Sequence, residues 1–262
     1  MTTTEATQKQ TIPSVRSSRP SRGRRAALAV TGFLACALPT VFTINITRML
    51  LTGVESDHQF HQLTGQGLIL MALWLGSLVP LLRAGWAGRR PSTLQGLLHL
   101  TFMATGTVCS VFAPGGGAPI LMGIIVLTGG LVWLALPQRP RLRSPLQLDP
   151  IAAPLALVAA AVFTPYVIAQ ERLQNAATGY HAQNPHYFDM AWMTLALTVL
   201  CVLGALLPAA RGLVAWLAAG ATVTGVAGLA FGEGTTWSLI VLALGLATTV
   251  GVAVGDRLRR SR

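Results

Sequence analysis

Eight long apolar segments, separated by short polar breaks, constrain this chain more than any other feature of its sequence. They cover residues 26–49, 65–83, 95–113, 117–136, 150–170, 189–209, 212–231 and 235–254. Each approaches or exceeds the roughly 20 residues that a helix needs to cross a bilayer, and none has an acidic or basic side chain near its middle. Because an open strand would leave backbone groups unpaired in lipid, the pattern predicts an all-α integral membrane protein with eight transmembrane helices.

The composition favours a membrane protein and argues against nucleic-acid binding. Hydrophobic residues make up 52% of the chain and charged residues only 10%, whereas soluble proteins carry about 25% charged residues. The formal charge of +11 comes from arginines clustered beside the apolar segments. At such positions arginines orient a membrane protein and contact anionic lipid headgroups. We therefore expect anionic lipids at the inner face as partners, and no nucleic acid.

Cations flank alternate ends of the apolar segments, which predicts the topology. Eight crossings place all of these clusters on one side of the membrane, and the positive-inside rule assigns that side to the cytoplasm. The sequence therefore predicts a multi-pass protein of the cell (plasma) membrane with both termini cytoplasmic. The cations on the predicted inner side are Lys9, Arg16, Arg19, Arg22, Arg24, Arg25, Arg83, Arg89, Arg90, Arg139, Arg141, Arg143, Arg211, Arg257, Arg259, Arg260 and Arg262.

Matching motifs in the two halves predict an internal repeat. The sequence LGSLVPLLR at 75–83 aligns with LGALLPAAR at 203–211, and the same shift of 128 positions places the motif at 58–61 on the motif at 186–189. We expect a disordered basic cytoplasmic tail over 1–25, a four-helix repeat over 26–144 and a second repeat over 145–262, which ends in a short basic cytoplasmic C-terminus. Four spans per half give both halves the same orientation, as in parallel-repeat transporters.

Histidines and carboxylates on the predicted outer face are candidate metal or haem ligands. His58 and His61 are spaced i, i+3, as are His186 and Asp189, so each pair shares one face if its helix begins early enough. The two pairs together offer three imidazoles and a carboxylate to one metal ion. Alternatively, His58 and His186 ligate a haem from opposite halves. A third interpretation is that all four are ordinary solvated residues at the membrane interface.

Two outer-face arginines are candidate ligand-binding residues. Arg48 and Arg172 end the first and fifth segments at matching positions, and Glu55 and Glu171 lie near them. The guanidinium groups suit an anionic substrate or a lipid headgroup. The alternative is structural, with Arg48 paired to Glu55 and Arg172 paired to Asp189.

Small residues and prolines predict how the spans pack. Ala247, Gly251 and Gly255 recur every four residues in the last span, a spacing that lets helices approach closely in lipid. Pro39 and Pro165 lie inside the first and fifth segments and should bend those helices.

Motifs of several common enzyme classes are absent from the sequence. It contains no GxxxxGK[ST], GxSxG or HExxH, the signatures of P-loop nucleotide binding, serine hydrolysis and zinc proteolysis. The three cysteines, Cys36, Cys109 and Cys201, form no CxxC pair and therefore indicate neither a disulfide framework nor a thiolate metal site. The sequence identifies no catalytic residue.

Two four-span halves with outer-face histidines resemble the architecture of haem A synthase. The sequence Glu55-Ser56-Asp57-His58 is similar to the Glu-x-x-His that this family carries at the outer start of its second span. The resemblance implies that His58 is a haem ligand. That family also carries histidines at the outer ends of its fourth and eighth spans, whereas residues 115–117 and 232–236 contain none here. The likeness therefore covers the architecture and one short motif.

Three functions are compatible with these features. The first is a non-enzymatic protein that binds or transports a small-molecule ligand, or assists another protein, through an outer cleft between the halves. The second is a haem- or metal-dependent membrane oxidoreductase. The third is a membrane subunit of a larger complex, with protein partners in the membrane.

Overall fold

The computed structural model describes residues 20–53 and 58–261, and within these ranges the chain forms helices and no strands. Eight of the helical segments are long and apolar enough to cross a membrane. The structure thus confirms the all-α class and the eight helices of spanning length. Glu55, Asp57 and most of the predicted basic tail lie outside the described residues.

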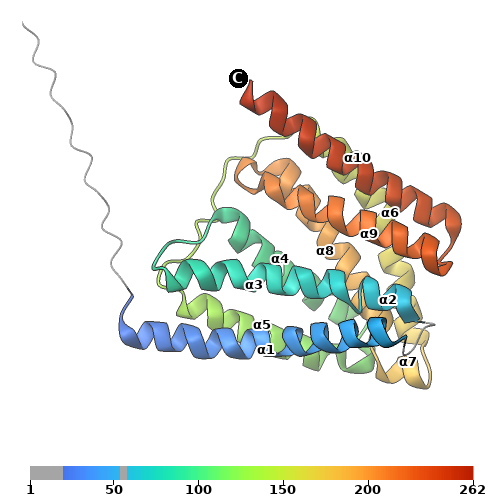
Figure 1. Cartoon of the computed structure of the whole chain (residues 1–262), viewed down its shortest axis with the longest axis horizontal. Helices are drawn as coiled ribbons and strands as arrows, with labels where there is room; N and C mark the ends of the chain where they lie inside the picture. Colours follow the sequence, from blue (N-terminus) through green and yellow to red (C-terminus); the bar gives the residue numbers. More distant parts are fainter. Residues whose placement is uncertain (1–19, 54–57, 262) are drawn as a thin grey trace, which may run out of the picture.

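The helices follow the predicted segments with modest changes at their ends (Figure 1). The first half contains α1 (Arg22–Thr52), α2 (Gln59–Leu63), α3 (Leu68–Trp86), α4 (Thr93–Phe112), η2 (Gly115–Gly117) and α5 (Ala118–Ala135). The second half contains α6 (Ala152–Ala176), α7 (Tyr180–Gln183), α8 (His186–Leu206), η3 (Pro208–Leu213), α9 (Val214–Phe231) and α10 (Thr235–Arg260). The short helix α2 precedes α3 within the second spanning segment, a division that the sequence analysis did not predict.

Helix α8 lies at the centre of the bundle and packs against α4, α6 and α9. Its side chains are buried along most of its length, and the Trp192 ring packs at a centroid distance of 4.5 Å from Phe102 of α4. The Trp192 indole Nε1–H also donates a 2.9 Å hydrogen bond to the Phe102 carbonyl oxygen. A tryptophan in an apolar core needs such a partner for its N–H, so this contact fixes α8 against the first half.

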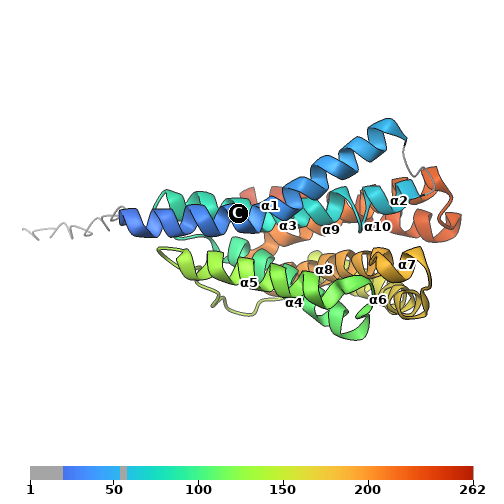
Figure 2. The ribbon, with the colours of Figure 1, turned by 90° about the horizontal axis from the view of Figure 1, so that it is seen from below.

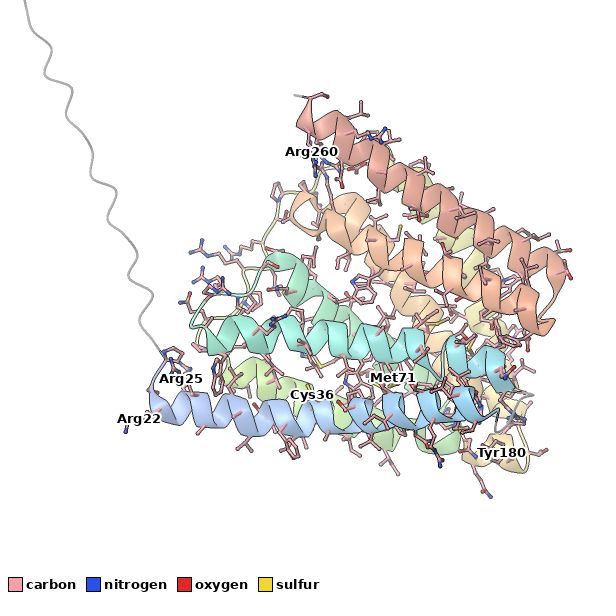
Figure 3. All side chains as sticks on the ribbon, in the orientation of Figure 1. Arg22, Arg25, Cys36, Met71, Tyr180 and Arg260 are labelled. Atoms are coloured by element: carbon pink, nitrogen blue, oxygen red, sulfur yellow. The ribbon has the colours of Figure 1, made fainter. Side chains whose placement is uncertain are left out.

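Opposite ends of the bundle differ in chemistry. Figure 3 shows Arg22, Arg25 and Arg260 far from Tyr180. We call the end with these arginines the arginine end. We call the end with Tyr180, where His181 and His186 pack against the tyrosine ring, the histidine end. At the arginine end, Asp149 forms ion pairs with Arg211 at 3.1 Å and with Arg259 at 3.3 Å. Asp149 Oδ1 also accepts hydrogen bonds from the first backbone amides of α6. One carboxylate therefore ties the connection between the halves to η3 and α10.

Helix α1 bends near its middle. Figure 2 shows its second half leaning away from the remaining helices toward the histidine end. Pro39 lies inside this helix, and a proline in a helix interior removes one backbone hydrogen bond and causes a kink. The bend separates the end of α1 from α8 and thereby makes room for a cavity described below.

Helices α9 and α10 make the most extensive pairwise contact in the bundle, and glycines permit it. A Cβ placed on Gly225 would lie 2.5 Å from the Leu242 backbone nitrogen, and a Cβ on Gly245 would overlap the Thr222 backbone. By contrast, Gly251 of the predicted small-residue stripe faces Leu155 and Ile151, near the start of α6. The closest helix contact in this half therefore involves glycines outside that stripe.

We predict that Gly225→Ala destabilises the bundle although alanine favours helix by roughly 1 kcal/mol over glycine. The added methyl group would press on the Leu242 backbone, and overpacking of this kind costs about 1–3 kcal/mol. The measurement is the thermal unfolding midpoint in detergent. The matched control is Gly123→Ala on α5, where a Cβ meets nothing within 4 Å and the midpoint should hold or rise. Equal midpoints for both variants would contradict this account of the α9–α10 contact.

Candidate functional site

Four of the five histidines gather at the histidine end of the bundle. His58, His181 and His186 each offer a ring nitrogen, and these three atoms lie within 4.8 Å of one another. The ring centroids of His58 and His186 are 5.3 Å apart, as are those of His181 and His186. We call these three residues the histidine cluster. They come from the start of α2, from α7 and from the start of α8, so the cluster joins the two halves of the chain.

His61 lies beside the histidine cluster, and its ring is farther from His58 and His186 than the His181 ring is. Its ring centroid lies 6.3 Å from His58 and 6.0 Å from His186. His61, His58 and His181 line one cavity of about 390 Å³, which also includes Glu233 and Trp237. Within the described part of the chain, His61 Nδ1, His181 Nδ1 and Trp237 Nε1 are buried and have no hydrogen-bond partner. Such atoms are costly in a protein interior, which indicates that the cavity holds water or a polar ligand.

The break between α2 and α3, residues 64–67, brings Gln66 to the cluster. A Cβ at Gly67 would overlap the Gln62 carbonyl oxygen, and one at Gly65 would lie 2.6 Å from Met190 Cα. Only glycine fits such close backbone approaches. Thr64 Oγ1 adds a contact of 3.1 Å to the Met190 sulfur. These contacts hold the break against α8 and point Gln66 toward His186.

Gln66 contacts the His186 ring directly, with 3.3 Å between the two Nε2 atoms. An amide presents an acceptor on one side and donors on the other, and a half-turn exchanges them. With the oxygen toward the ring, Gln66 accepts a hydrogen bond from His186 Nε2–H, and this tautomer leaves Nδ1 free to ligate. His186 Nδ1 is buried and has no partner among the described residues, which agrees with such a role.

Gln174 of α6 positions His181 and the first turn of α8, which carries His186, through the backbone. Its side chain is buried. Its Nε2 donates a 3.0 Å hydrogen bond to the His181 carbonyl oxygen, and its Oε1 accepts one of 3.2 Å from the Phe188 amide. One side chain therefore connects α7 to the first turn of α8. Asn184 closes the intervening turn through a 3.0 Å hydrogen bond to the Tyr180 carbonyl oxygen.

A second cavity, of about 430 Å³, lies beside the cluster and includes two of the predicted residues. Asp189 and Arg48 both line it, together with Gln66. Asp189 is 8% exposed and belongs to this cavity, whereas the sequence analysis placed it with the histidines as a ligand of one metal. We call this space the α1 cavity, because residues of α1 form one of its walls.

The remaining predicted residues are distributed differently. Glu171 and Arg172 line neither of the two cavities at the histidine end. No ion pair joins Arg172 to Asp189; the ion pairs found in residues 20–53 and 58–261 all involve Asp149 or Asp256. The proposed pairing of Arg48 with Glu55 involves a residue outside the described ranges.

Three residues of the site were not singled out from the sequence. His181 is a third candidate ligand, whereas Gln66 and Gln174 contact or position the histidines. His181 and His186 flank an Asn184-Pro185 turn, a local signal for a chain reversal that could have brought them together in advance. The fifth histidine has a different role. The His99 ring packs at a centroid distance of 6.3 Å from Trp133. Its Nδ1 contacts Ser77 and its Nε2 contacts the Gly129 carbonyl oxygen, so both ring nitrogens have partners.

Comparison of the chain with protein-family models, with curated proteins and with solved structures gave no match. The function of the chain is therefore inferred from the geometry of the histidine end.

We predict that Gln174→Leu loosens the histidine end. The change would leave the His181 carbonyl and the Phe188 amide without their partner, and an unsatisfied buried group costs about 1–3 kcal/mol. Hydrogen exchange should show faster exchange of the Phe188 amide, with a lower unfolding midpoint. Gln183→Leu, at an exposed position in α7, serves as the control. Unchanged Phe188 exchange in Gln174→Leu would show that this bridge does not hold the loop.

Proposed function

We propose that this chain is a multi-pass plasma-membrane protein that binds a first-row transition-metal ion at the extracytoplasmic end of its bundle. The single observation that carries this proposal is the convergence of His58, His181 and His186, with ring nitrogens within 4.8 Å of one another. The role that we propose is to bind, transport or pass on the metal in the cleft between the two halves. An accessory role toward another membrane protein is compatible with the same chemistry.

The composition of the histidine cluster favours zinc, copper, nickel or iron over magnesium and calcium. Imidazole nitrogen suits the first group, whereas the second prefers carboxylate and carbonyl oxygen. Two nitrogens on one tetrahedral zinc ion lie roughly 3.3 Å apart, so each imidazole would have to move by less than ~1 Å to close on the ion. Three histidines leave a fourth position open, as in sites where a metal exchanges a ligand.

Packing around the cluster favours a single ion over a haem. A bis-histidine haem has its porphyrin between the two imidazoles. Here the Tyr180 ring lies 5.4 Å and the His181 ring 5.3 Å from His186, while both also pack within 6.1 Å of His58. These rings fill the space that the macrocycle would need, which argues against the haem alternative.

The orientation and the repeat belong to the same proposal. The arginine clusters lie at the ends of the spanning helices that face away from the histidine end. By the positive-inside rule, this supports an orientation with the histidines outside and both termini in the cytoplasm. The helix contacts support a duplicated four-helix unit: α1–α3, α3–α4, α4–α5 and α1–α5 in one half correspond to α6–α8, α8–α9, α9–α10 and α6–α10 in the other. His58 and His186, which match at a shift of 128 positions, meet in the cluster.

We predict that detergent-purified protein binds about one transition-metal ion per chain, as three-histidine sites do, and that the double variant His58→Ala/His186→Ala binds none. Removing two of three imidazoles leaves a single ligand, which cannot hold the ion. The measurements are elemental analysis for iron, copper, nickel and zinc, and titration calorimetry of the metal-free protein. An absorption spectrum in the Soret region tests for haem in the same samples.

The control is Gln183→Ala, an exposed change in the same loop, which should leave the metal content unchanged. Thermal unfolding of all samples verifies that the variants fold. Metal content equal in wild type and double variant, with both folded, would overturn the proposal. A Soret band that the double variant loses would replace the ion with a haem.

We predict that Gln66→Leu weakens metal binding by roughly 10–100-fold, the usual effect of removing a hydrogen bond to a ligating histidine. Leucine keeps the volume but cannot accept the His186 Nε2–H, so the tautomer and the ring orientation are no longer fixed. Gln66→Glu retains an acceptor at the same place and should bind metal better than Gln66→Leu. Equal affinities for the two variants would assign Gln66 no role in positioning His186.

A further inference from the structure

The α1 cavity lies beneath the bent second half of α1. Its volume of about 430 Å³ falls within the roughly 300–1,000 Å³ of small-molecule sites. Figure 2 shows this part of α1 leaning away from α5 and α8. Residues of α1, α3, α5 and α8 line the space, and α1 is among the least buried of the spanning helices. A cavity walled on one side by such a peripheral helix can be entered from the lipid.

Asp189 supplies an acidic group to this cavity. Its side chain lines the space and is 8% exposed. Within residues 20–53 and 58–261, no ion pair or hydrogen bond to its carboxylate is present. A carboxylate buried in a membrane protein is costly unless it is paired, and is by default a sign of function. The cavity therefore favours a ligand that brings a positive charge with N–H donors.

Arg48 supplies the opposite charge at the exposed side of the same cavity. Its guanidinium Nη2 donates a 3.2 Å hydrogen bond to Asn45 Oδ1, and both residues line the space. Arginine suits phosphate because its planar donors match two oxygens at once. A buried carboxylate and an exposed guanidinium in one cavity are complementary to a ligand with an ammonium and a phosphate.

Polarity changes with depth along three walls of the cavity. On α1, Arg48 lies near the histidine end and Phe42 about 9 Å farther along the helix axis. On α8, Asp189 precedes Trp192 by one turn, and Gln66 precedes Leu70 and Trp74 in the same direction. Polar groups therefore line the end of the cavity near the membrane surface, and apolar groups line its deeper part. This gradient matches a lipid headgroup with the first part of its acyl chains.

We propose that the α1 cavity binds a phospholipid with a phosphoethanolamine headgroup. The headgroup ammonium donates to the Asp189 carboxylate, the phosphate accepts from Arg48, and the acyl chains pass Phe42 and Leu70 toward the bilayer interior. An anionic lipid without an amine would leave Asp189 unpaired, and a bare metal ion would face the Arg48 charge. This assignment requires the chain to lie in a membrane, but it holds whether or not the histidine cluster binds a metal.

The first test uses the wild-type chain and a headgroup series. The purified protein is exchanged into vesicles of phosphatidylglycerol that contain an equal small fraction of phosphatidylethanolamine, its mono- or dimethyl derivative, or phosphatidylcholine. Native mass spectrometry then measures the lipid that each chain retains. Retention should fall at least tenfold from the ethanolamine to the choline headgroup, because methylation removes the N–H donors that Asp189 accepts.

The second test uses variants in the same assay. Asp189→Asn should lose the preference for the amine, and Arg48→Gln should weaken retention of every phospholipid in the series. Arg172→Gln is the matched control, since Arg172 also ends an outer helix but does not line the cavity. The unfolding midpoint of each variant in detergent verifies its fold; if Asp189→Asn does not fold, the wild-type headgroup series decides alone.

The outcomes distinguish a membrane phospholipid from a free soluble headgroup, which carries the same ammonium and phosphate. Soluble O-phosphoethanolamine that displaces the lipid at equal concentration would assign the site to the free headgroup and overturn the lipid assignment. Equal retention across the wild-type headgroup series, or preferential retention of phosphatidylglycerol, would overturn the proposal. The metal assay and the lipid assay use different variants and different readouts, so the failure of one proposal does not decide the other.

Discussion

Helix α8 is buried along 72% of its most apolar stretch, against 22–56% in the other seven spanning segments, and the rest of the structure is arranged around it. In a bilayer the hydrophobic effect does not draw helices together, so close packing and hydrogen bonds must hold them. The bond from Trp192 Nε1 to the Phe102 carbonyl and the fit of Gly65 against Met190 are such contacts. Because α8 begins at His186, the same packing that fixes the helix fixes the histidine cluster.

The spanning helices could be predicted from the sequence because lipid leaves few alternatives to a long apolar helix. The histidine end could be predicted only in part. The match between residues 58–61 and 186–189 correctly brought His58 near His186, but it said nothing of His181, which lies in α7 and aligns with no histidine at that shift. Gln66 and Gln174 could not be predicted for another reason. Their roles come from tertiary contacts, and no spacing in the sequence marks a glutamine that bridges two segments.

Matching positions in the two halves have different surroundings. Arg48 and Arg172 end corresponding helices, yet Arg48 lines the α1 cavity whereas Arg172 lines neither cavity at the histidine end. The difference follows from packing, since α6 is in extensive contact with α8 and buries small residues such as Ala156 and Ala159, whereas the second half of α1 leans away from the other helices. An alignment of the halves alone would therefore give Arg48 and Arg172 equivalent surroundings, whereas in the described residues only Arg48 lines one of the two cavities at the histidine end.

Gln66 links the two proposed sites, because it lines the α1 cavity and also contacts His186. The amide orientation that accepts the His186 Nε2–H leaves its N–H₂ donors facing away from the ring, and a phosphate oxygen in the cavity is an acceptor for them. That orientation is also the one that frees His186 Nδ1 for a metal. A lipid headgroup in the cavity and a metal in the cluster would therefore favour the same state of one side chain, and by thermodynamic linkage each would strengthen the binding of the other.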